Sequence, residues 1–302
     1  MAYRYVMYET GDKIARITLN RPDKFNALNY PMKKELVAAL KEAEADDDVS
    51  VIILKGAGKH FSSGIELGAG TIGDPGENNP PRGFYLSKKL DDMAGSFTYD
   101  ILGDFRVIWD LLKPVIAQVH GYCLTGAFEL ATVCDLRMVA EDAVIGDPMK
   151  RVRGVGHLVH HPWVMGLTRG KELLLTGRPM TGKQSVEWHW ANYAYPIDRL
   201  EEETEKLAQQ ITTIPPEVLM LSKRACNRSF EIMGFKVATD VCSDLFTLGG
   251  YMNEQYFHEM ARQKGARVAL ERRDGPWQDY SQRPRTVEPS KSAPKSRSRK
   301  TS

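Results

Sequence analysis

The sequence lacks any apolar run near the roughly 20 residues that a membrane-spanning helix needs. It opens with Met1-Ala2-Tyr3-Arg4 and passes directly into strand-like sequence, without the apolar stretch of a secretory signal peptide. We therefore expect a cytoplasmic protein with no membrane partner.

Cysteine is scarce as well, with four residues in 302. Cys123, Cys134, Cys226 and Cys242 lack the close pairing of zinc ligands, so no metal site is expected, and an intracellular chain would keep them reduced. Cys123 and Cys134 are best interpreted as small buried packing residues.

A strong net charge is also absent, since 41 basic residues face 39 acidic ones. Residues 278–302 hold seven basic and two acidic residues, a net of +5, which leaves about −3 for the rest. This tail is rich in Ser, Pro, Lys and Arg and has few apolar residues, which predicts disorder. A basic tail can hold nucleic acid by charge alone, but a solubilising end is the preferred interpretation, and a nucleic-acid partner is not expected.

What the sequence does contain is an ordinary soluble composition, 42% hydrophobic and 26% charged, in a chain long enough for a substantial core. Strand-like and helix-like segments alternate along its first part, which predicts an α/β fold. The expected strands are 14–19, 51–54, 115–119, 136–140 and 143–146, and the expected helices there are 30–45 and 126–132. After residue 199 the segments 200–213, 216–230, 233–249 and 253–272 read as helices.

Residues 120–135 carry the clearest chemical signal. A short apolar strand ends at Gly121, and a helix is expected from about Thr125. The first N–H groups of such a helix have no partner within it, and together with the helix dipole they favour an oxygen that carries negative charge. Glu129 lies three residues after Gly126, so both face the same side of the helix.

A second segment repeats this layout. The strand that begins at Val51 runs into small residues and then into Ser63-Gly64-Ile65-Glu66-Leu67, where a short helix is expected. This segment offers a second backbone N–H near Ile65. Two such turns could hold one carbonyl oxygen between them.

Together the two segments resemble the crotonase family, also called the enoyl-CoA hydratase/isomerase family. Residues 17–28 resemble its opening strand and loop, 60–67 its first oxyanion segment and 114–135 its second. Residues 173–182 and 271–274 resemble later landmarks, so the likeness covers about residues 3–277.

The resemblance implies a spiral of β-β-α units and an acyl-coenzyme A substrate. Coenzyme A enters as part of that substrate, and no other cofactor is expected. The backbone N–H groups of Ile65 and Gly126 would hold the thioester oxygen while an enolate develops, with Glu129 as general base or acid. The implied substrate-binding residues are Lys24, Asn26, Ala27, Ser63, Gly64, Glu66, Leu67, Gly68, Thr125 and Met149. Lys24 and the pair Arg272-Arg273 are candidate phosphate contacts.

The family pattern also divides the chain. Residues 1–199 are expected to form the spiral core with the coenzyme A and acyl sites, and 200–277 a helical region. In the family this region packs on neighbours, which implies a homotrimer or homohexamer. Residues 278–302 form the basic tail.

One departure concerns the chemistry. Hydratases of the family carry a second glutamate where Met149 stands here, and a thioether cannot exchange the protons of a water molecule. The replacements considered are Asp147, His157, His160 and His161, although the stretch from His160 to Trp163 fits packing against a helix better.

The reaction therefore stays open at this stage. Hydration or isomerisation is the first interpretation. Thioester hydrolysis, carbon–carbon cleavage and a catalytically decayed scaffold with a nucleic-acid-binding tail are the alternatives.

A second departure concerns the acyl pocket, because Ile65 and Thr125 stand where small residues are usual. A long loop rich in Gly, Pro and Asn covers residues 68–83. It suggests a substrate unlike a simple short chain. Candidate pocket residues there are Phe84, Tyr85, Met93, Phe97 and Tyr99, which also fit the apolar face of a helix.

Overall fold

The computed structural model describes residues 3–66, 100–154, 160–249 and 255–280. Six strands form the larger sheet, in the order β1-β2-β3-β4-β6-β9. β1 pairs antiparallel with β2, and the other neighbours pair in parallel. The strands are β1 (Val6–Gly11), β2 (Ile14–Leu19), β3 (Val51–Gly56), β4 (Val115–Val119), β6 (Leu136–Ala140) and β9 (Tyr193–Tyr195).

A smaller sheet has the order β5-β7-β8 and consists of β5 (Tyr122–Leu124), β7 (Val144–Gly146) and β8 (Met180–Thr181). The first helices are η1 (Pro22–Lys24), α1 (Tyr30–Ala45), α3 (Asp100–Asp110), α4 (Gly126–Val133), α5 (Lys150–Arg153), α6 (His161–Thr176) and α7 (Gly182–Glu187). The later ones are α8 (Ile197–Ile211), α9 (Pro216–Ile232), α10 (Phe235–Gly249), α11 (Gln255–Lys264) and α12 (Ala266–Asp274).

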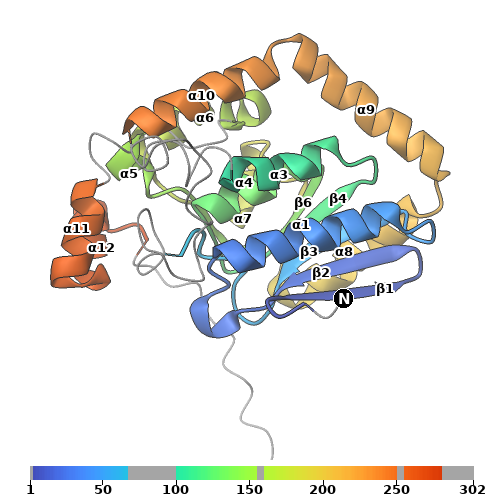
Figure 1. The fold of residues 1–302 in the computed structure, drawn as a ribbon, viewed down its shortest axis with the longest axis horizontal. Helices are drawn as coiled ribbons and strands as arrows, with labels where there is room; N and C mark the ends of the chain where they lie inside the picture. Colours follow the sequence, from blue (N-terminus) through green and yellow to red (C-terminus); the bar gives the residue numbers. More distant parts are fainter. Residues whose placement is uncertain (1–2, 67–99, 155–159, 250–254, 281–302) are drawn as a thin grey trace, which may run out of the picture.

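Helices cover both faces of the larger sheet. In Figure 1, α1 lies in front of the strands and α8 behind them. The central parallel strands are correspondingly buried, and all five residues of β4 are buried. The core thus lies between the sheet and its helices, and includes the fully buried rings of Phe61, Phe105, Phe128 and Trp190.

The local sequence explains the first helix. Asn29 precedes it in extended conformation, and its side-chain oxygen accepts a hydrogen bond of 3.0 Å from the N–H of Met32. Pro31 occupies the first turn, where a missing N–H costs nothing. Strands 14–19, 115–119 and 136–140 and helix 30–45 have the predicted bounds.

Two helix predictions were wrong in part. The expected helix 253–272 is divided into α11 and α12, because Gly265 adopts φ +90° between them. Within the expected short helix after Ser62, the described residues up to Glu66 form no helix, and Ser62 and Ile65 form β-bridges. The remaining predicted helices are present with shifted ends.

The C-terminal helices arch over the body and end beside α5 (Figure 1). There Met149, Phe257 and Ala269 form a small apolar cluster. Arg151 of α5 forms ion pairs of 3.1 Å with Asp274 and 2.6 Å with Asp279. The rings of Trp277 and Tyr280 lie against the same guanidinium group, 4.5 and 5.3 Å from it. Arg151 therefore fastens the end of the described chain to α5.

Cys123 and Cys134 are buried free thiols, which confirms their predicted packing role. Within the parts of the chain that the structure describes, no helix combines the length and apolarity required to cross a bilayer.

Candidate active site

Residues 62–66 of the first proposed oxyanion segment lie between β5 on one side and Leu28 on the other. Ser62 pairs with Cys123 in a parallel bridge, in which the N–H of Leu124 donates to Ser62 O at 3.1 Å. On the other side, Leu28 N donates to Gly64 O at 2.8 Å, and Glu66 N donates to Leu28 O at 3.1 Å. In such a parallel bridge both hydrogen bonds come from the residues that flank Ile65, so the N–H of Ile65 itself points away from Leu28.

The second segment lies on the side to which that N–H points. Gly126 is the first residue of α4, so its N–H has no partner within the helix. A Cβ atom added to Gly126 would lie 3.7 Å from the amide nitrogen of Ile65. The structure therefore places Gly126 beside the amide of Ile65, and these are the two residues that the sequence singled out.

Glycine at position 64 permits this approach. Gly64 has φ +90°, and a Cβ there would lie 1.7 Å from Thr125 Oγ1 and 2.3 Å from Leu124 O. Thr125 itself has φ +51°, a conformation that a β-branched residue rarely adopts, and its N–H donates to Gly146 O at 2.9 Å. Tight packing and local strain thus fix the two segments against each other.

The carboxylate of Glu129 lies in a buried charged cluster. The side chain of Glu129 is 2% exposed, and its Oε1 lies 3.7 Å from Lys150 Nζ, which is equally buried. Lys150 Nζ also lies 2.9 Å from Asp147 Oδ2. One ammonium group therefore stands between two carboxylates, which lowers the cost of keeping each of them charged in the interior.

Two histidines lie beside this cluster. The pKa of His161 is lowered to about 4, mainly by burial and also by the nearby Lys150, against the opposing effect of Glu129 and Asp147. Burial also lowers the pKa of His160 to about 3. Both rings are therefore neutral at pH 7. His161 packs on Phe128 with ring centroids 4.6 Å apart, as the packing interpretation of this stretch predicted.

Met149 does not join the charged cluster. Its sulfur lies 3.1 Å from Arg273 Nη1, and its side chain packs with Phe257 and Ala269 of the C-terminal helices. Arg273 also forms an ion pair of 2.7 Å with Asp274. The substrate-binding role of Met149 and the phosphate-binding role of Arg273 stay predictions.

The loop predicted to lie along coenzyme A is well ordered by hydrogen bonds. Asn26 is fully buried and donates to Ala57 O at 2.8 Å and His60 O at 2.7 Å. Ala27 O accepts a hydrogen bond of 2.7 Å from Arg21, which also pairs with Glu66 at 3.1 Å. Asn26 and Glu66 thus hold the loop to the first oxyanion segment. Lys24 and Ser63 have exposed and half-buried side chains, respectively.

Several predicted residues lie outside the described part of the chain. They are Leu67, Gly68, His157, the loop 68–83 and the pocket candidates Phe84, Tyr85, Met93, Phe97 and Tyr99.

Lys150 is the functional candidate that the sequence reasoning missed. Asp147 was considered as a replacement carboxylate, and Lys150 follows it by three residues, the spacing of a helical ion pair. That spacing was the available signal. The contact with Glu129 depends on the packing of α5 against α4 and has no local signature.

Comparisons with known proteins show the family to which the chain belongs. The family model described as enoyl-CoA hydratase/isomerase matches residues 9–282. EchA13 of Mycobacterium tuberculosis, which bears the name of an enoyl-CoA hydratase, is 34% identical over 261 residues, or 82% of this chain and 80% of that protein. A peroxisomal Δ3,5-Δ2,4-dienoyl-CoA isomerase of Arabidopsis thaliana is 34% identical over 185 residues, which are 59% of this chain and 64% of its own length.

Solved structures of enoyl-CoA hydratases and isomerases are similar to this chain as well. The crystal structure of an enoyl-CoA hydratase/isomerase from Xanthobacter autotrophicus Py2 superposes with a TM-score of 0.80 at 30% identity, covering 91% of this chain and 99% of that one. That of an enoyl-CoA hydratase from Mycobacterium smegmatis superposes with a TM-score of 0.81 at 31% identity, covering 90% and 94%. The spiral α/β fold predicted from the sequence is confirmed, and this chain belongs to the enoyl-CoA hydratase/isomerase family.

Proposed function

We propose that this protein catalyses proton transfer next to the carbonyl group of an acyl-coenzyme A thioester, through an enolate held by the N–H groups of Ile65 and Gly126. The observation that carries the proposal is the close approach of Gly126 to the amide of Ile65, with Glu129 one helical turn further along α4. Backbone donors fixed before reaction stabilise the charge that develops on the oxygen.

Glu129 supplies the proton transfer in this proposal. Its carboxylate removes a proton from the carbon beside the thioester carbonyl, and the electron pair moves onto the carbonyl oxygen. Lys150 Nζ, 3.7 Å away, favours the ionised carboxylate that a base requires. Asp147 pairs with Lys150 at 2.9 Å and holds it in place.

The geometry favours migration of a carbon–carbon double bond. A 3-enoyl thioester loses a proton from carbon 2 to Glu129, and the same carboxyl group returns it to carbon 4, which leaves a 2-enoyl thioester. This reaction needs one carboxylate. Met149, at the place of the second glutamate of the hydratases, packs against the C-terminal helices.

Hydration is the second candidate, because the polar pair of Lys150 and Asp147 adjoins Glu129. In that case water adds to carbon 3 of a 2-enoyl thioester, and carbon 2 takes up the proton. Product analysis separates the two reactions, because only hydration adds the mass of one water.

The test is an assay of 2-hexenoyl- and 3-hexenoyl-coenzyme A with the native protein and Glu129→Gln. We expect a loss on the order of 10²- to 10⁴-fold in kcat, the usual contribution of a general acid or base. Glu187→Gln, at the exposed end of α7, is the matched control and keeps its rate. Unchanged turnover in Glu129→Gln contradicts the mechanism.

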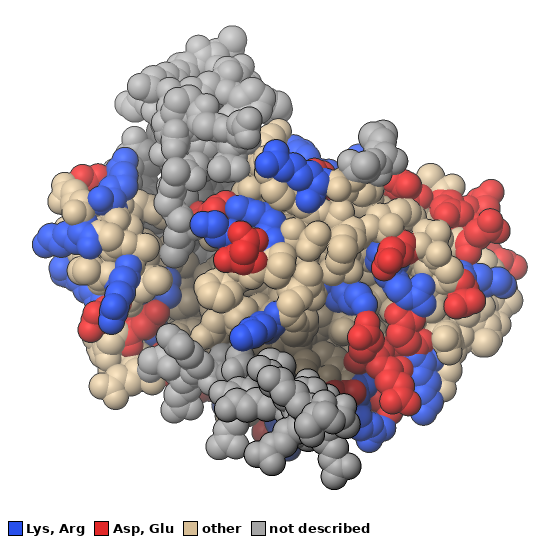
Figure 2. Space-filling model, turned by 90° about the horizontal axis from the view of Figure 1, so that it is seen from below, with Lys and Arg blue, Asp and Glu red and all other residues tan. Residues whose placement is uncertain are grey.

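We also propose that basic side chains around the site bind the phosphates of coenzyme A. Lys24 is exposed at the end of η1, and Arg272 is exposed on α12, where it donates to Tyr256 Oη at 3.0 Å. Figure 2 shows Lys and Arg side chains prominent at the end of the molecule that α11 and α12 occupy in Figure 1. The reaction proposed here needs no cofactor besides this carrier.

We also propose that the protein assembles into trimers or hexamers, as the resemblance to the family implies. Helices α9 and α10 and the turn between them expose several large apolar side chains, a pattern that marks interaction surfaces. They include Leu221, Ile232, Met233, Val237 and Val241, which are 52% to 86% exposed. Light scattering of the purified protein tests the assembly.

A further inference from the structure

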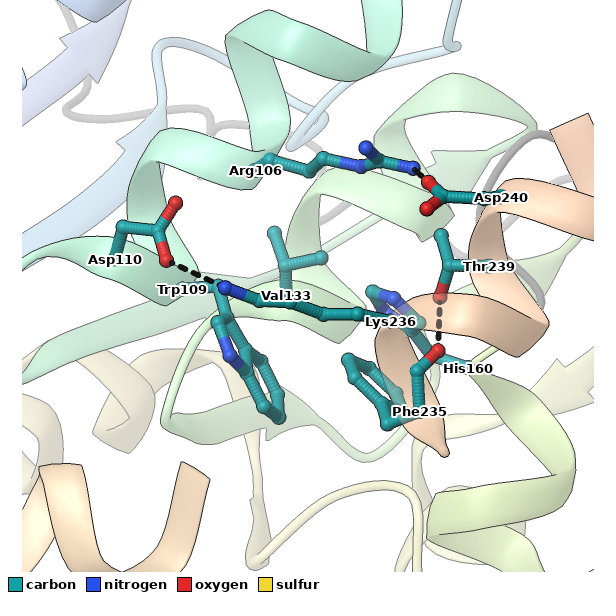
Figure 3. Close-up of a pocket in the computed structure, with 9 residues that line it drawn as sticks. All are labelled: Arg106, Trp109, Asp110, Val133, His160, Phe235, Lys236, Thr239 and Asp240. Carbon is teal, nitrogen blue, oxygen red and sulfur yellow. Dashed lines mark hydrogen bonds and ion pairs between the residues drawn. The ribbon is translucent and has the colours of Figure 1, made fainter. Parts of the chain in front are cut away.

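A cavity of about 160 Å³ lies beside the proposed active site, between α3, α4, α10 and the residue preceding α6 (Figure 3). Its apolar lining includes Trp109, Val133 and Phe235, and His160 adds a polar edge. None of the reaction steps described above uses it.

The position of the cavity follows from the helix that carries Glu129. Gly126, Glu129 and Val133 are three and four residues apart and share one face of α4. Val133 lines the cavity, about 10 Å along the helix axis from Gly126 at 1.5 Å per residue. A thioester whose carbonyl lies at Gly126, and whose reacting carbons lie at Glu129, therefore directs its acyl group toward the cavity.

The size of the cavity suits one ring. An engineered apolar cavity of about 150 Å³ in another protein binds benzene, so about 160 Å³ accommodates a six-membered aromatic ring. Flat side chains stacked on one another contribute to its lining. The rings of Trp109 and Phe235 stack with centroids 4.4 Å apart, and the ring of His160 lies 4.4 Å from that of Phe235. Such walls pair well with a planar aromatic group.

The polar groups of the cavity indicate a substituent on that ring. Nδ1 of His160 is buried and has no hydrogen-bond partner among the described residues. Because burial lowers the pKa of His160 to about 3, the imidazole is neutral and its free nitrogen can pair with a hydroxyl group as donor or acceptor.

The charged residues of the lining are already paired with one another. Arg106 lies 2.7 Å from Asp240, and Lys236 lies 3.4 Å from Asp110, as Figure 3 shows. Each of these four charged groups already has a partner of opposite sign, so none of them is free to pair with a charged substituent, and a neutral polar substituent fits better.

We propose that the cavity binds the ring of a hydroxylated aromatic acyl group, carried on coenzyme A, such as a 3-(4-hydroxyphenyl)propanoyl group. The proposal rests on the proposed function for the direction of the acyl chain, and it adds the substrate class.

The test compares three saturated thioesters, the butanoyl, 3-phenylpropanoyl and 3-(4-hydroxyphenyl)propanoyl derivatives of coenzyme A. Enolate formation exchanges the protons beside their carbonyl groups for deuterium, which mass spectrometry follows in heavy water. We expect the aromatic thioesters to exchange with at least tenfold higher kcat/KM than butanoyl-coenzyme A, and the hydroxylated one to exceed the unsubstituted one. Equal or faster exchange of the butanoyl derivative overturns the proposal.

Binding measured by calorimetry separates failure of this inference from failure of the proposed function. If none of the thioesters exchanges but the hydroxylated one binds most tightly, the cavity assignment stands and the enolate mechanism falls. If the butanoyl derivative exchanges and binds as well as the others, the mechanism stands and the cavity assignment falls.

Variants test the cavity directly. Val133→Phe fills it and should reduce the aromatic-to-butanoyl ratio of kcat/KM at least tenfold, whereas Leu175→Phe, 81% exposed on α6, should leave the ratio unchanged. His160→Leu should abolish the preference for the hydroxylated ring over the unsubstituted one. Phe235→Leu, which removes an aromatic wall, provides a second test should Val133→Phe not fold. An unchanged ratio in a folded Val133→Phe or Phe235→Leu protein contradicts the proposal.

Discussion

Substitution of Gly64 by alanine tests whether catalysis depends on the relative position of the two proposed oxyanion segments. Gly64 lies next to Ile65, and an added Cβ would stand 2.3 Å from the backbone oxygen of Leu124. Real Cβ contacts essentially never fall below 3.0 Å, so residues 62–66 must move from the second segment by at least about 0.7 Å. The obstacle is backbone and cannot rotate away.

The expected effect on catalysis is large. A misplacement near 1 Å can cost about 10²-fold in rate, and the loss of one oxyanion donor costs on the order of 10²- to 10³-fold, or about 3 to 4 kcal/mol. We expect a decrease of this size in deuterium exchange beside the thioester carbonyl. Affinity for the thioester should change less, because the donors act mainly on the charge that develops during reaction.

Gly265→Ala is the matched control. Gly265 shares the φ of +90° of Gly64, but a Cβ added there would have no atom of the described residues within 4 Å. Both variants should lose about 1 to 3 kcal/mol of stability in urea unfolding, from backbone strain alone, and only Gly64→Ala should lose exchange. Exchange within tenfold of the native rate in a folded Gly64→Ala protein would refute the reasoning.

Three further outcomes are expected. Lys150→Met leaves the carboxylates of Glu129 and Asp147 buried without their cation and should lower the free energy of unfolding by about 3 to 5 kcal/mol; Lys150→Arg should lose less. The pKa of His161 is lowered from 6.5 to about 4 in the folded protein, mainly by burial. Between pH 6.5 and 4, His161 is therefore protonated in the unfolded chain and neutral in the folded protein. Stability should therefore decline over that window, by an amount on the order of 3 kcal/mol from this residue, and an equally steep decline in His161→Gln would contradict the assignment. Deletion of residues 281–302 should leave turnover unchanged and remove any salt-sensitive binding to nucleic acid, as a salt titration of both proteins would show.

Local patterns were sufficient for much of the fold. Helix α1 has the predicted bounds because its cap, its first-turn proline and its apolar spacing all lie within its own residues. The position of the two segments proposed to bind the thioester oxygen was also predicted, because each is a strand followed by small residues. Their approach depended on family resemblance at the sequence level, and the structure supplies the contact between Gly126 and Ile65.

Other features depend on tertiary packing and could not be read from the sequence. The ion pair between Lys150 and Glu129 joins helices that are separated by two strands along the chain. The direction of the Met149 side chain follows from helices α11 and α12, more than 100 residues later. The division of the last predicted helix at Gly265 was missed because one glycine within an otherwise helical pattern is a weak signal.

The attachment of Arg151 to Asp274 and Asp279 has a practical consequence for anyone who engineers this chain. Arg151 directly follows Lys150, which faces Glu129. A deletion that removes the two aspartates would therefore loosen Lys150 and lower activity, although the deleted residues lie more than 100 positions later in the chain. An affinity tag or fused partner joined after Tyr280 leaves that fastening whole, which makes the stretch beyond it the safer place to add one.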